Sequence, residues 1–233
     1  MKAKKTTLSI LIPAYNEEEN IEKIIKGCQK LKQYELDILV AVDGKTTDNT
    51  YEKAEKLGVR VIKSKSTGGK GITFREAIKH LRGDYVIQID ADYQFLPDDI
   101  PKLMDSLQNG CDVALGTRYR KGASIEKGSV SLLKRAGSFG LSFTTSIFTG
   151  QRITDVMAGF KGFKRKVLID LDPQTDHFGY EAELVIKAAK KKYKIREVPI
   201  NYKKRITGNS SIHLIKHGIL TLSSIIRVGI TGK

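Results

Sequence analysis

The sequence lacks the features that mark a secreted, disulfide-bonded or membrane-spanning protein. Its two cysteines, Cys28 and Cys111, lie inside periodic apolar segments without metal-ligand spacing, which predicts reduced packing residues in a cytosolic protein. No uncharged apolar run reaches the roughly 18–20 residues that span a bilayer. The apolar run after the basic start is too short for a secretory signal. With no internal repeat or linker, the 233 residues are expected to form a single domain, residues 1–233.

Acidic residues are scarce in one half of the chain only. Residues 1–117 contain 18 basic and 18 acidic residues, whereas residues 118–233 contain 23 and 8, so the second half carries the whole net charge of +15. A basic surface of this size favours an anionic partner, which could be nucleic acid, an anionic membrane or a phosphorylated substrate. The charge alone does not choose among them.

Strand and helix patterns alternate regularly through the first half. Apolar runs predict strands and helical spacing predicts helices between them, which is typical of an α/β fold with a mostly parallel, Rossmann-like sheet flanked by helices. The expected strands are Leu8–Ile12, Leu36–Val42, Val59–Ile62, Tyr85–Ile89 and Asp112–Leu115, and the expected helices are Glu17–Leu31, Thr47–Leu57, Gly71–Leu81 and Pro97–Leu107. Ligands of such sheets bind beyond the carboxyl ends of the strands.

Two segments of the second half, residues 131–148 and 212–230, carry apolar stripes at helical spacing and few charges. Amphipathic helices that lie in a membrane interface have this pattern, and so do helices that pack on a core. The pattern alone favours the packed interpretation. The basic charge of the same half favours an interface.

Polar clusters follow the first, second and fourth expected strands: residues 13–17, Asp43 and the pair Asp90 and Asp92. All three are expected at one rim of the sheet, where they can share a ligand. Side chains at i and i+2 of a strand share a face, so the two aspartates can converge on one point. Two carboxylates repel unless a cation lies between them, and a hard divalent ion such as Mg²⁺ or Mn²⁺ suits carboxylate oxygens. Gln94 could supply a further oxygen.

A glycine-rich segment, residues 68–71, opens the third expected helix. Backbone N–H groups at a helix start, together with Lys70, suit an anion. The segment is not a Walker P-loop, because the G-x-x-x-x-G-K-[ST] pattern is absent. Asp43, followed by a glycine, could accept hydrogen bonds from a base or a ribose.

Taken together, these clusters resemble the family-two glycosyltransferases of the GT-A fold, and most closely the dolichyl- and polyprenyl-phosphate sugar synthases. The matching segments run in the family's order over nearly the whole chain: LSILIPAYNEEENI (8–21), VDGKTTDNT (42–50), GGKG (68–71), GDYVIQIDADYQFLPDDI (83–100), GTRYRKG (116–122), TDVMAGFKGF (154–163), REVPINY (196–202) and RITGNSS (205–211). The resemblance implies a nucleotide-sugar-binding half, residues 1–117, and an acceptor- and membrane-facing half, residues 118–233.

The resemblance also implies a role for individual residues. The nucleotide sugar would be bound by Pro13, Ala14, Tyr15, Glu17, Asp43, Lys70, Asp90, Ala91 and Asp92. Asp90, Asp92 and Gln94 would hold Mg²⁺ or Mn²⁺ on its diphosphate. The acceptor phosphate would meet Arg118, Arg135 (chosen over Lys134), Arg205 and Ser210. Asp92, Arg118 and Asp155 would be the catalytic residues.

The acceptor type determines whether a base is needed. A phosphate monoester, with a second pKa of about 6, reaches the site already ionised, whereas a sugar hydroxyl would need a carboxylate base, for which Asp155 or Glu181 would be candidates. The expected activity is inverting transfer of a hexose from a GDP- or UDP-linked sugar to dolichyl or polyprenyl phosphate. The expected place is the anionic cytoplasmic face of a membrane, where the protein is peripheral. Transfer to a glycan hydroxyl is the alternative. A nucleic-acid-binding module would not explain the rim aspartates, which repel phosphates.

Overall fold

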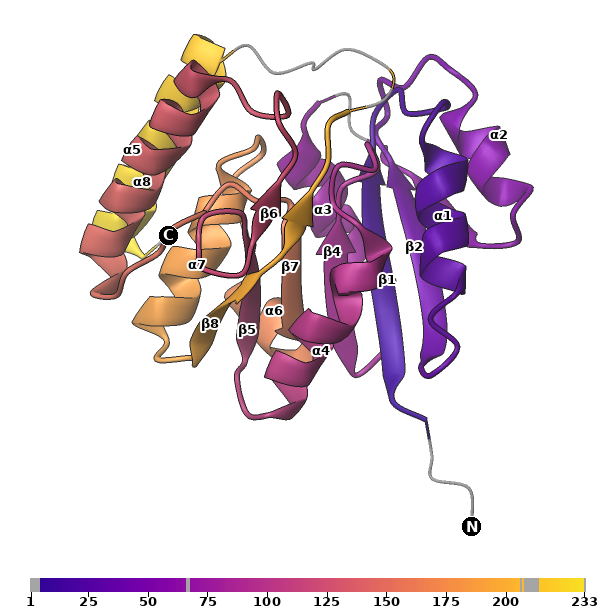
Figure 1. The fold of residues 1–233 in the computed structure, drawn as a ribbon, viewed down its shortest axis with the longest axis horizontal. Helices are drawn as coiled ribbons and strands as arrows, with labels where there is room; N and C mark the ends of the chain where they lie inside the picture. Colours follow the sequence, from indigo (N-terminus) through magenta and orange to yellow (C-terminus); the bar gives the residue numbers. More distant parts are fainter. Residues whose placement is uncertain (1–4, 66–67, 206, 208–213, 233) are drawn as a thin grey trace.

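A seven-stranded sheet is the middle layer of the computed structural model, which describes residues 5–65, 68–205, 207 and 214–232 (Figure 1). Its order is β3-β2-β1-β4-β7-β5-β8, and every neighbouring pair is parallel except those that involve β7. The strands are β1 (Thr7–Ala14), β2 (Glu35–Val42), β3 (Arg60–Lys63), β4 (Tyr85–Ile89), β5 (Val113–Thr117), β7 (Phe160–Lys164) and β8 (Ile195–Pro199). The expected mostly parallel α/β sheet is confirmed.

Helices cover both faces of this sheet (Figure 1). One face packs against α1 (Ile21–Gln29), α2 (Thr50–Glu55) and α4 (Ile100–Gln108), which follows the short 3-10 turn η1 (Pro97–Asp99). The other packs against α3 (Lys70–Ile78), α6 (Arg165–Leu171) and α7 (Tyr180–Lys190). In α1 the buried residues are Ile21, Ile24, Ile25 and Cys28, whose spacing puts them on one helical face. Both cysteines are buried and free, as expected.

The sequence pattern predicted neither β8 nor the antiparallel strand β7 of this sheet. The β7 sequence, FKGFK, has no apolar run, and Lys161 within it is fully buried. The strand inserts between β4 and β5, so it brings the segment before it, residues 154–159, next to the end of β4. A chain segment from the second half therefore becomes part of the rim where the aspartate pair lies.

A second, two-stranded parallel sheet joins β6 (Ser124–Ile125) to β9 (Asn201–Tyr202). Tyr202 also forms an isolated antiparallel bridge with Phe95, and the Gln94 side-chain amide donates to the Lys203 carbonyl at 3.0 Å. These contacts hold the end of the chain's last strand against the loop that follows β4. They thereby bring Tyr202 and Arg205 to the rim.

The helices α5 (Leu132–Thr149) and α8 (Leu214–Thr231) lie side by side at one end of the molecule, next to α7 (Figure 1). Within the described residues, no helix is long and apolar enough to cross a membrane. The packed interpretation of their apolar stripes is wrong. Leu132, Phe139, Phe143 and Ile147 of α5 are 56–85% exposed, and the α8 stripe, Ile215, Ile219, Leu222, Ile226 and Ile230, is 38–77% exposed.

Small polar residues, rather than the stripe, form the buried side of α5, and they include Ser142 and Thr145. The buried side of α8 includes Thr221, Ser224, Ile225 and Val228. A side chain at Gly229 would collide with the Phe148 ring, 2.4 Å from its Cβ position, so the two helices approach closely there. The two helices therefore contact each other and α7 through small residues together with Phe148, Ile225 and Val228, and present the large side chains of their stripes outward.

Candidate active site

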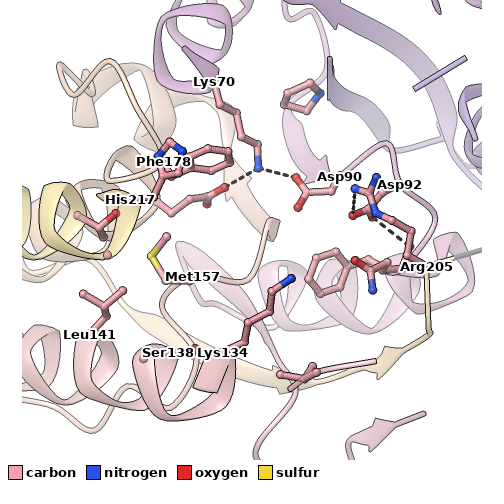
Figure 2. A pocket seen from close by; sticks show the side chains of 18 of the residues that line it. Lys70, Asp90, Asp92, Lys134, Ser138, Leu141, Met157, Phe178, Arg205 and His217 are labelled. Carbon is pink, nitrogen blue, oxygen red and sulfur yellow. Dashed lines mark hydrogen bonds and ion pairs between the residues drawn. The ribbon is translucent and has the colours of Figure 1, made fainter. Parts of the chain in front are cut away.

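A cavity of about 960 Å³ opens at the carboxyl ends of the strands and extends between α5 and α8 (Figure 2). Both halves of the chain line it. Every residue expected to bind the nucleotide sugar is on its wall: Pro13, Ala14, Tyr15, Glu17, Asp43, Lys70, Asp90, Ala91 and Asp92. The three rim clusters thus share one cavity, as the positions of the strand ends predicted.

Each aspartate of the pair is in contact with a basic side chain (Figure 2). The Lys70 ammonium lies 2.6 Å from Asp90 Oδ1, and an Arg205 guanidinium nitrogen lies 2.9 Å from Asp92 Oδ2. The same Arg205 nitrogen lies 3.1 Å from Glu17 Oε1. Burial raises the pKa of Asp90 to about 6, although Lys70 opposes this. Lys70 and Arg205 therefore already offset part of the negative charge of Asp90, Asp92 and Glu17.

Behind Lys70 lies a buried carboxylate, Glu181, at the start of α7. Its Oε1 accepts from Gln88 at 2.7 Å and from Lys70 at 3.2 Å, and its Oε2 accepts from Lys161 at 2.6 Å. Burial alone would raise the pKa of Glu181, but Lys161 and Lys70 outweigh it and the pKa is lowered. Glu181 is thus an ionised, fully engaged group in the first turn of α7 rather than a proton acceptor.

The Asp90 carboxylate packs directly on Gly159. A Cβ built at Gly159 would lie 2.1 Å from Asp90 Oδ2, so no larger residue leaves this carboxylate in place. Within the described residues, no group of three or more histidine, cysteine, aspartate or glutamate side chains could hold a metal ion. The Gln94 amide donates to Lys203, and its backbone N–H donates to Asp92 Oδ1 at 3.1 Å. Two aspartates with one amide nearby fit a divalent ion that takes its other ligands from a bound phosphate or from water.

Asp43 is held on both carboxylate oxygens. Oδ1 accepts from the Lys45 backbone N–H at 2.9 Å, and Oδ2 accepts from the Thr73 hydroxyl at 3.2 Å. The carboxylate is 7% exposed and lines the cavity. A fixed acceptor of this kind suits the hydroxyl or N–H donors of a nucleoside.

Two backbone donors at the start of α3 are already occupied by the chain itself. Gly71 and Ile72 donate their N–H groups to the Asp176 carbonyl at 3.0 and 3.3 Å, so these two groups do not bind an anion. The glycines serve packing instead. A Cβ at Gly69 or Gly71 would lie 2.3 Å and 2.1 Å from the Asp176 and Thr175 carbonyl oxygens, respectively. The Lys70 side chain lines the cavity, together with Gly69 and Thr73.

Arg118 and Asp155 form a second enclosed ion pair beside the cavity. Asp155 Oδ2 accepts from Arg118 Nε at 2.7 Å and Asp155 Oδ1 from the terminal nitrogen at 2.8 Å. Burial alone would lower the pKa of Arg118, but Asp155 outweighs it and raises the pKa. Tyr119 and Tyr202 flank the guanidinium, with ring centroids at 5.3 and 4.8 Å. Arg118 lines the cavity, whereas Asp155 is 0% exposed and lies behind it.

Asp155 is in turn held by Glu197 of β8. One Glu197 oxygen accepts from the Thr154 backbone and hydroxyl, at 2.6 and 2.9 Å, and from the Asp155 backbone at 3.2 Å. The other accepts from Arg120 at 2.6 Å. Spacing in the sequence did not reveal Glu197, because its partners lie more than 40 residues away. Asp155 therefore orients Arg118 and has no access to a substrate.

The expected acceptor residues divide into three cases. Arg118 and Arg205 line the cavity. Ser210 lies outside the described residues. Arg135 does not line the cavity; it is exposed, with its guanidinium 5.7 Å from the centre of the Tyr119 ring. Lys134 lines the cavity instead, and Figure 2 shows its side chain extending into it from α5.

Between α5 and α8 the cavity wall becomes largely apolar, although Ser138 and His217 also line it (Figure 2). Leu141, Met157, Phe178 and Leu222 line it, together with Gly137, Gly140 and Gly218, where an added Cβ would meet nothing within 4 Å. Sequence reasoning did not assign these residues to the site, because Leu141 and Leu222 occupy positions typical of ordinary helix contacts and Met157 and Phe178 lie in turns. The cavity thus has a polar end with acidic and basic groups and an apolar end between two helices.

Comparison with known proteins agrees with this geometry. Residues 9–172 match the sequence profile of glycosyl transferase family 2, and the chain therefore belongs to that family of glycosyltransferases. It is similar to a dolichyl-phosphate hexose transferase of Haloferax volcanii, 30% identical over 95% of this chain and 93% of the relative. It is also 31% identical to a dolichol-phosphate mannosyltransferase of Pyrococcus furiosus over 88% of this chain, which spans 59% of that protein's length.

A solved structure shares the fold. Glucosyl-3-phosphoglycerate synthase from Mycobacterium tuberculosis, in complex with Mn²⁺, UDP-glucose and phosphoglyceric acid, aligns with a TM-score of 0.78 at 22% identity. The alignment covers 98% of this chain and 81% of that one. The GT-A fold expected from the sequence is confirmed.

Proposed function

We propose that the chain transfers a hexose from a nucleotide-diphosphate sugar to a dolichyl or polyprenyl phosphate, with inversion at the anomeric carbon. The proposal rests on the ion-pair and hydrogen-bond partners of the carboxylates that line the cavity. In the described part of the chain, each carboxylate on the wall already has a cationic or hydrogen-bonding partner: Glu17, Asp43, Asp90, Asp92 and Glu181. Asp155, the other candidate base, is enclosed by Arg118.

An acceptor that arrives ionised suits such a site. A sugar hydroxyl must lose a proton to a base during transfer. A phosphate monoester has a second pKa of about 6 and is largely ionised near pH 7. Arg118 and Lys134 line the cavity between the aspartate pair and the apolar end, where they would bind the acceptor phosphate.

The chain's own residues would act by positioning and by charge. Asp155 keeps Arg118 rigid, so its guanidinium can hold the attacking phosphate in one orientation. Lys70 and Arg205 are placed to stabilise the negative charge of the leaving diphosphate. Because donor and acceptor groups line different ends of one cavity, attack from the face opposite the leaving group is favoured, and the product would be inverted.

A divalent ion, Mg²⁺ or Mn²⁺, would be held by Asp90 and Asp92, with Gln94 alongside. Such an ion neutralises a diphosphate and makes it a better leaving group. The structural neighbour with Mn²⁺ and UDP-glucose supports this assignment. The relatives' names include both a hexose and a mannose transferase, so the proposal covers GDP- and UDP-linked sugars.

The exposed helices would place this site at a membrane. The stripes of α5 and α8 expose large apolar side chains beside the apolar end of the cavity. Lys216 and Arg227 are exposed on α8, and the second half of the chain carries the +15 excess. Basic residues near an anionic leaflet contribute about 1 kcal/mol each. We therefore place the protein peripherally on the cytoplasmic leaflet, where the two apolar stripes enter the interface.

A paired-acceptor assay tests the proposal. GDP-mannose, UDP-glucose and UDP-N-acetylglucosamine are each supplied with Mn²⁺ and anionic vesicles that contain either a polyprenyl phosphate or the corresponding polyprenol. We expect one donor to give a glycosylated lipid phosphate and none to modify the alcohol, with Asp92→Ala abolishing the product. Comparable transfer to the alcohol, or to a soluble glycan without lipid, would refute the phosphate-acceptor mechanism.

A further inference from the structure

Four side chains of alternating charge run from the interior of the sheet to the aspartate pair. Lys161 contacts Glu181 at 2.6 Å, Glu181 contacts Lys70 at 3.2 Å, and Lys70 contacts Asp90 at 2.6 Å. The proposed reaction gives a role to Lys70 and Asp90 at the cavity. It gives none to Lys161 and Glu181, although a buried charge pair is costly to keep.

The inner pair is built as a rigid unit. Lys161 is 0% exposed within β7, and besides Glu181 it donates to the Ala158 carbonyl. Glu181 is 1% exposed and also accepts from Gln88, whose amide donates to the Tyr180 hydroxyl as well, at 2.8 Å. A carboxylate held by three donors from three elements has no freedom to follow a ligand. Its oxygen nearest the cavity is therefore a fixed point.

Lys70 lies between this fixed point and Asp90. Its ammonium also faces the rings of Phe178 and Tyr180, with centroids at 5.7 and 5.8 Å. Such rings attract a cation. The ammonium therefore has a stable environment on one side that does not depend on Asp90, and Asp90 is the partner on the cavity side.

We propose that Glu181, fixed by Lys161 and Gln88, is a positioning residue that retains Lys70 at the site when a divalent ion takes Asp90. Lys70 and the ion compete for the same carboxylate and repel each other, and a bound diphosphate attracts both. Lys70 therefore makes metal binding depend on nucleotide binding, and by linkage the reverse. The inference rests on the proposed function, because it takes a nucleoside diphosphate as the ligand.

The test measures Mn²⁺ affinity from the free-ion electron paramagnetic resonance signal, with and without GDP or UDP. In the wild-type protein we expect the matching nucleotide to tighten Mn²⁺ binding at least about fivefold. Lys70→Met should bind Mn²⁺ alone more tightly and show a smaller coupling, namely the part that comes from direct contact between the ion and the phosphates. Glu181→Gln should weaken Mn²⁺ binding. Lys70 then loses its ion pair with Glu181 and competes more strongly with the ion for Asp90.

The double variant Lys70→Met/Glu181→Gln distinguishes an effect of Glu181 that acts through Lys70 from a direct effect of its negative charge on the ion. If Glu181 acts through Lys70, its substitution changes Mn²⁺ affinity little in the Lys70→Met background. An equal loss in both backgrounds would overturn the inference. Glu183→Gln is the matched control, since Glu183 is a fully buried carboxylate on the same helix that pairs with Lys187, and it should leave the nucleotide coupling unchanged.

Two further outcomes keep the inference separate from the proposed function. Should Glu181→Gln fail to fold, Lys161→Met/Glu181→Gln removes both buried charges and should show the same weakened Mn²⁺ binding; wild-type affinity in that variant would contradict the positioning role. If neither GDP nor UDP changes Mn²⁺ affinity in the wild-type protein, the proposed nucleotide-sugar function itself fails. If coupling is present and is undiminished in Lys70→Met, the inference alone fails.

Discussion

Replacing Asp155 by asparagine tests how the Arg118 guanidinium is held. Asp155 is 0% exposed and accepts three hydrogen bonds from Arg118, including one from its backbone N–H at 3.0 Å. Asparagine has one acceptor oxygen and turns an amide N–H₂ group toward the guanidinium. The substitution should therefore leave a largely buried positive charge without its counter-ion.

The size of the effect follows from that burial. The Arg118 side chain is 11% exposed, so solvent screens the pair weakly. Removing one partner of a buried ion pair typically costs about 3–5 kcal/mol of stability. A misplaced donor to the reacting charge typically costs about 10²–10³ in turnover. We expect Asp155→Asn to lower the free energy of unfolding by about 3 kcal/mol and turnover by about 10²-fold.

Urea unfolding and transfer kinetics measure the two effects, and a double-mutant cycle assigns them. If Asp155 acts only by orienting Arg118, then Asp155→Asn should add little to the loss of turnover already caused by Arg118→Met. Asp112→Asn is the control, because Asp112 pairs with Lys164 at 2.8 Å near the start of β5, away from the cavity. Fully additive losses, or a new pH dependence that indicates a lost base, would refute the positioning role.

Three other predictions concern different parts of the molecule. Gly159→Ala should displace the Asp90 carboxylate and weaken Mn²⁺ binding at least tenfold in calorimetry, while circular dichroism shows the fold retained; unchanged affinity would contradict the close approach. Burial, followed by the charge of His217, lowers the pKa of His177. The neutral His177 side chain therefore contributes fully to folding stability above pH 6.5, and this contribution is lost as the pH falls below that value. His177→Gln should flatten this decline in urea melts between pH 7 and 5, and an identical decline would count against the assignment. Phe143→Ser/Ile219→Ser, at side chains 66% and 64% exposed, should leave stability within about 0.5 kcal/mol but abolish sedimentation with anionic vesicles; undiminished sedimentation would argue against the interface.

The donor side of the site could be predicted from the chain because its information is local. An apolar run ends, a polar cluster follows, and parallel strands bring those ends to one rim. Asp43, Asp90 and Asp92 therefore reach the cavity as expected. Arg205, which pairs with Asp92, could not be assigned in the same way, because it lies 113 residues further along the chain.

Local pattern was misleading where two environments produce the same spacing. Stripes such as Phe139 and Phe143 have the period of a core-facing helix, and only the positions of α5 and α8 show that they face outward. Neighbouring basic residues present the same difficulty: Lys134 and Arg135 are equivalent in sequence, and the rotation of α5 puts Lys134 on the cavity wall. Sequence periodicity records which residues share a face, not what that face meets.

The sequence by itself determined the alternation of strands and helices, the rim at which a ligand binds, the paired carboxylates and the basic second half. Those features depend on period, on residue type and on the handedness of chain connections. Tertiary structure alone decided that β7 inserts antiparallel, that Asp155 serves Arg118, and that Lys161 and Glu181 support Lys70. Such contacts join residues far apart in the chain, and a buried charge is stable only where folding supplies its partner.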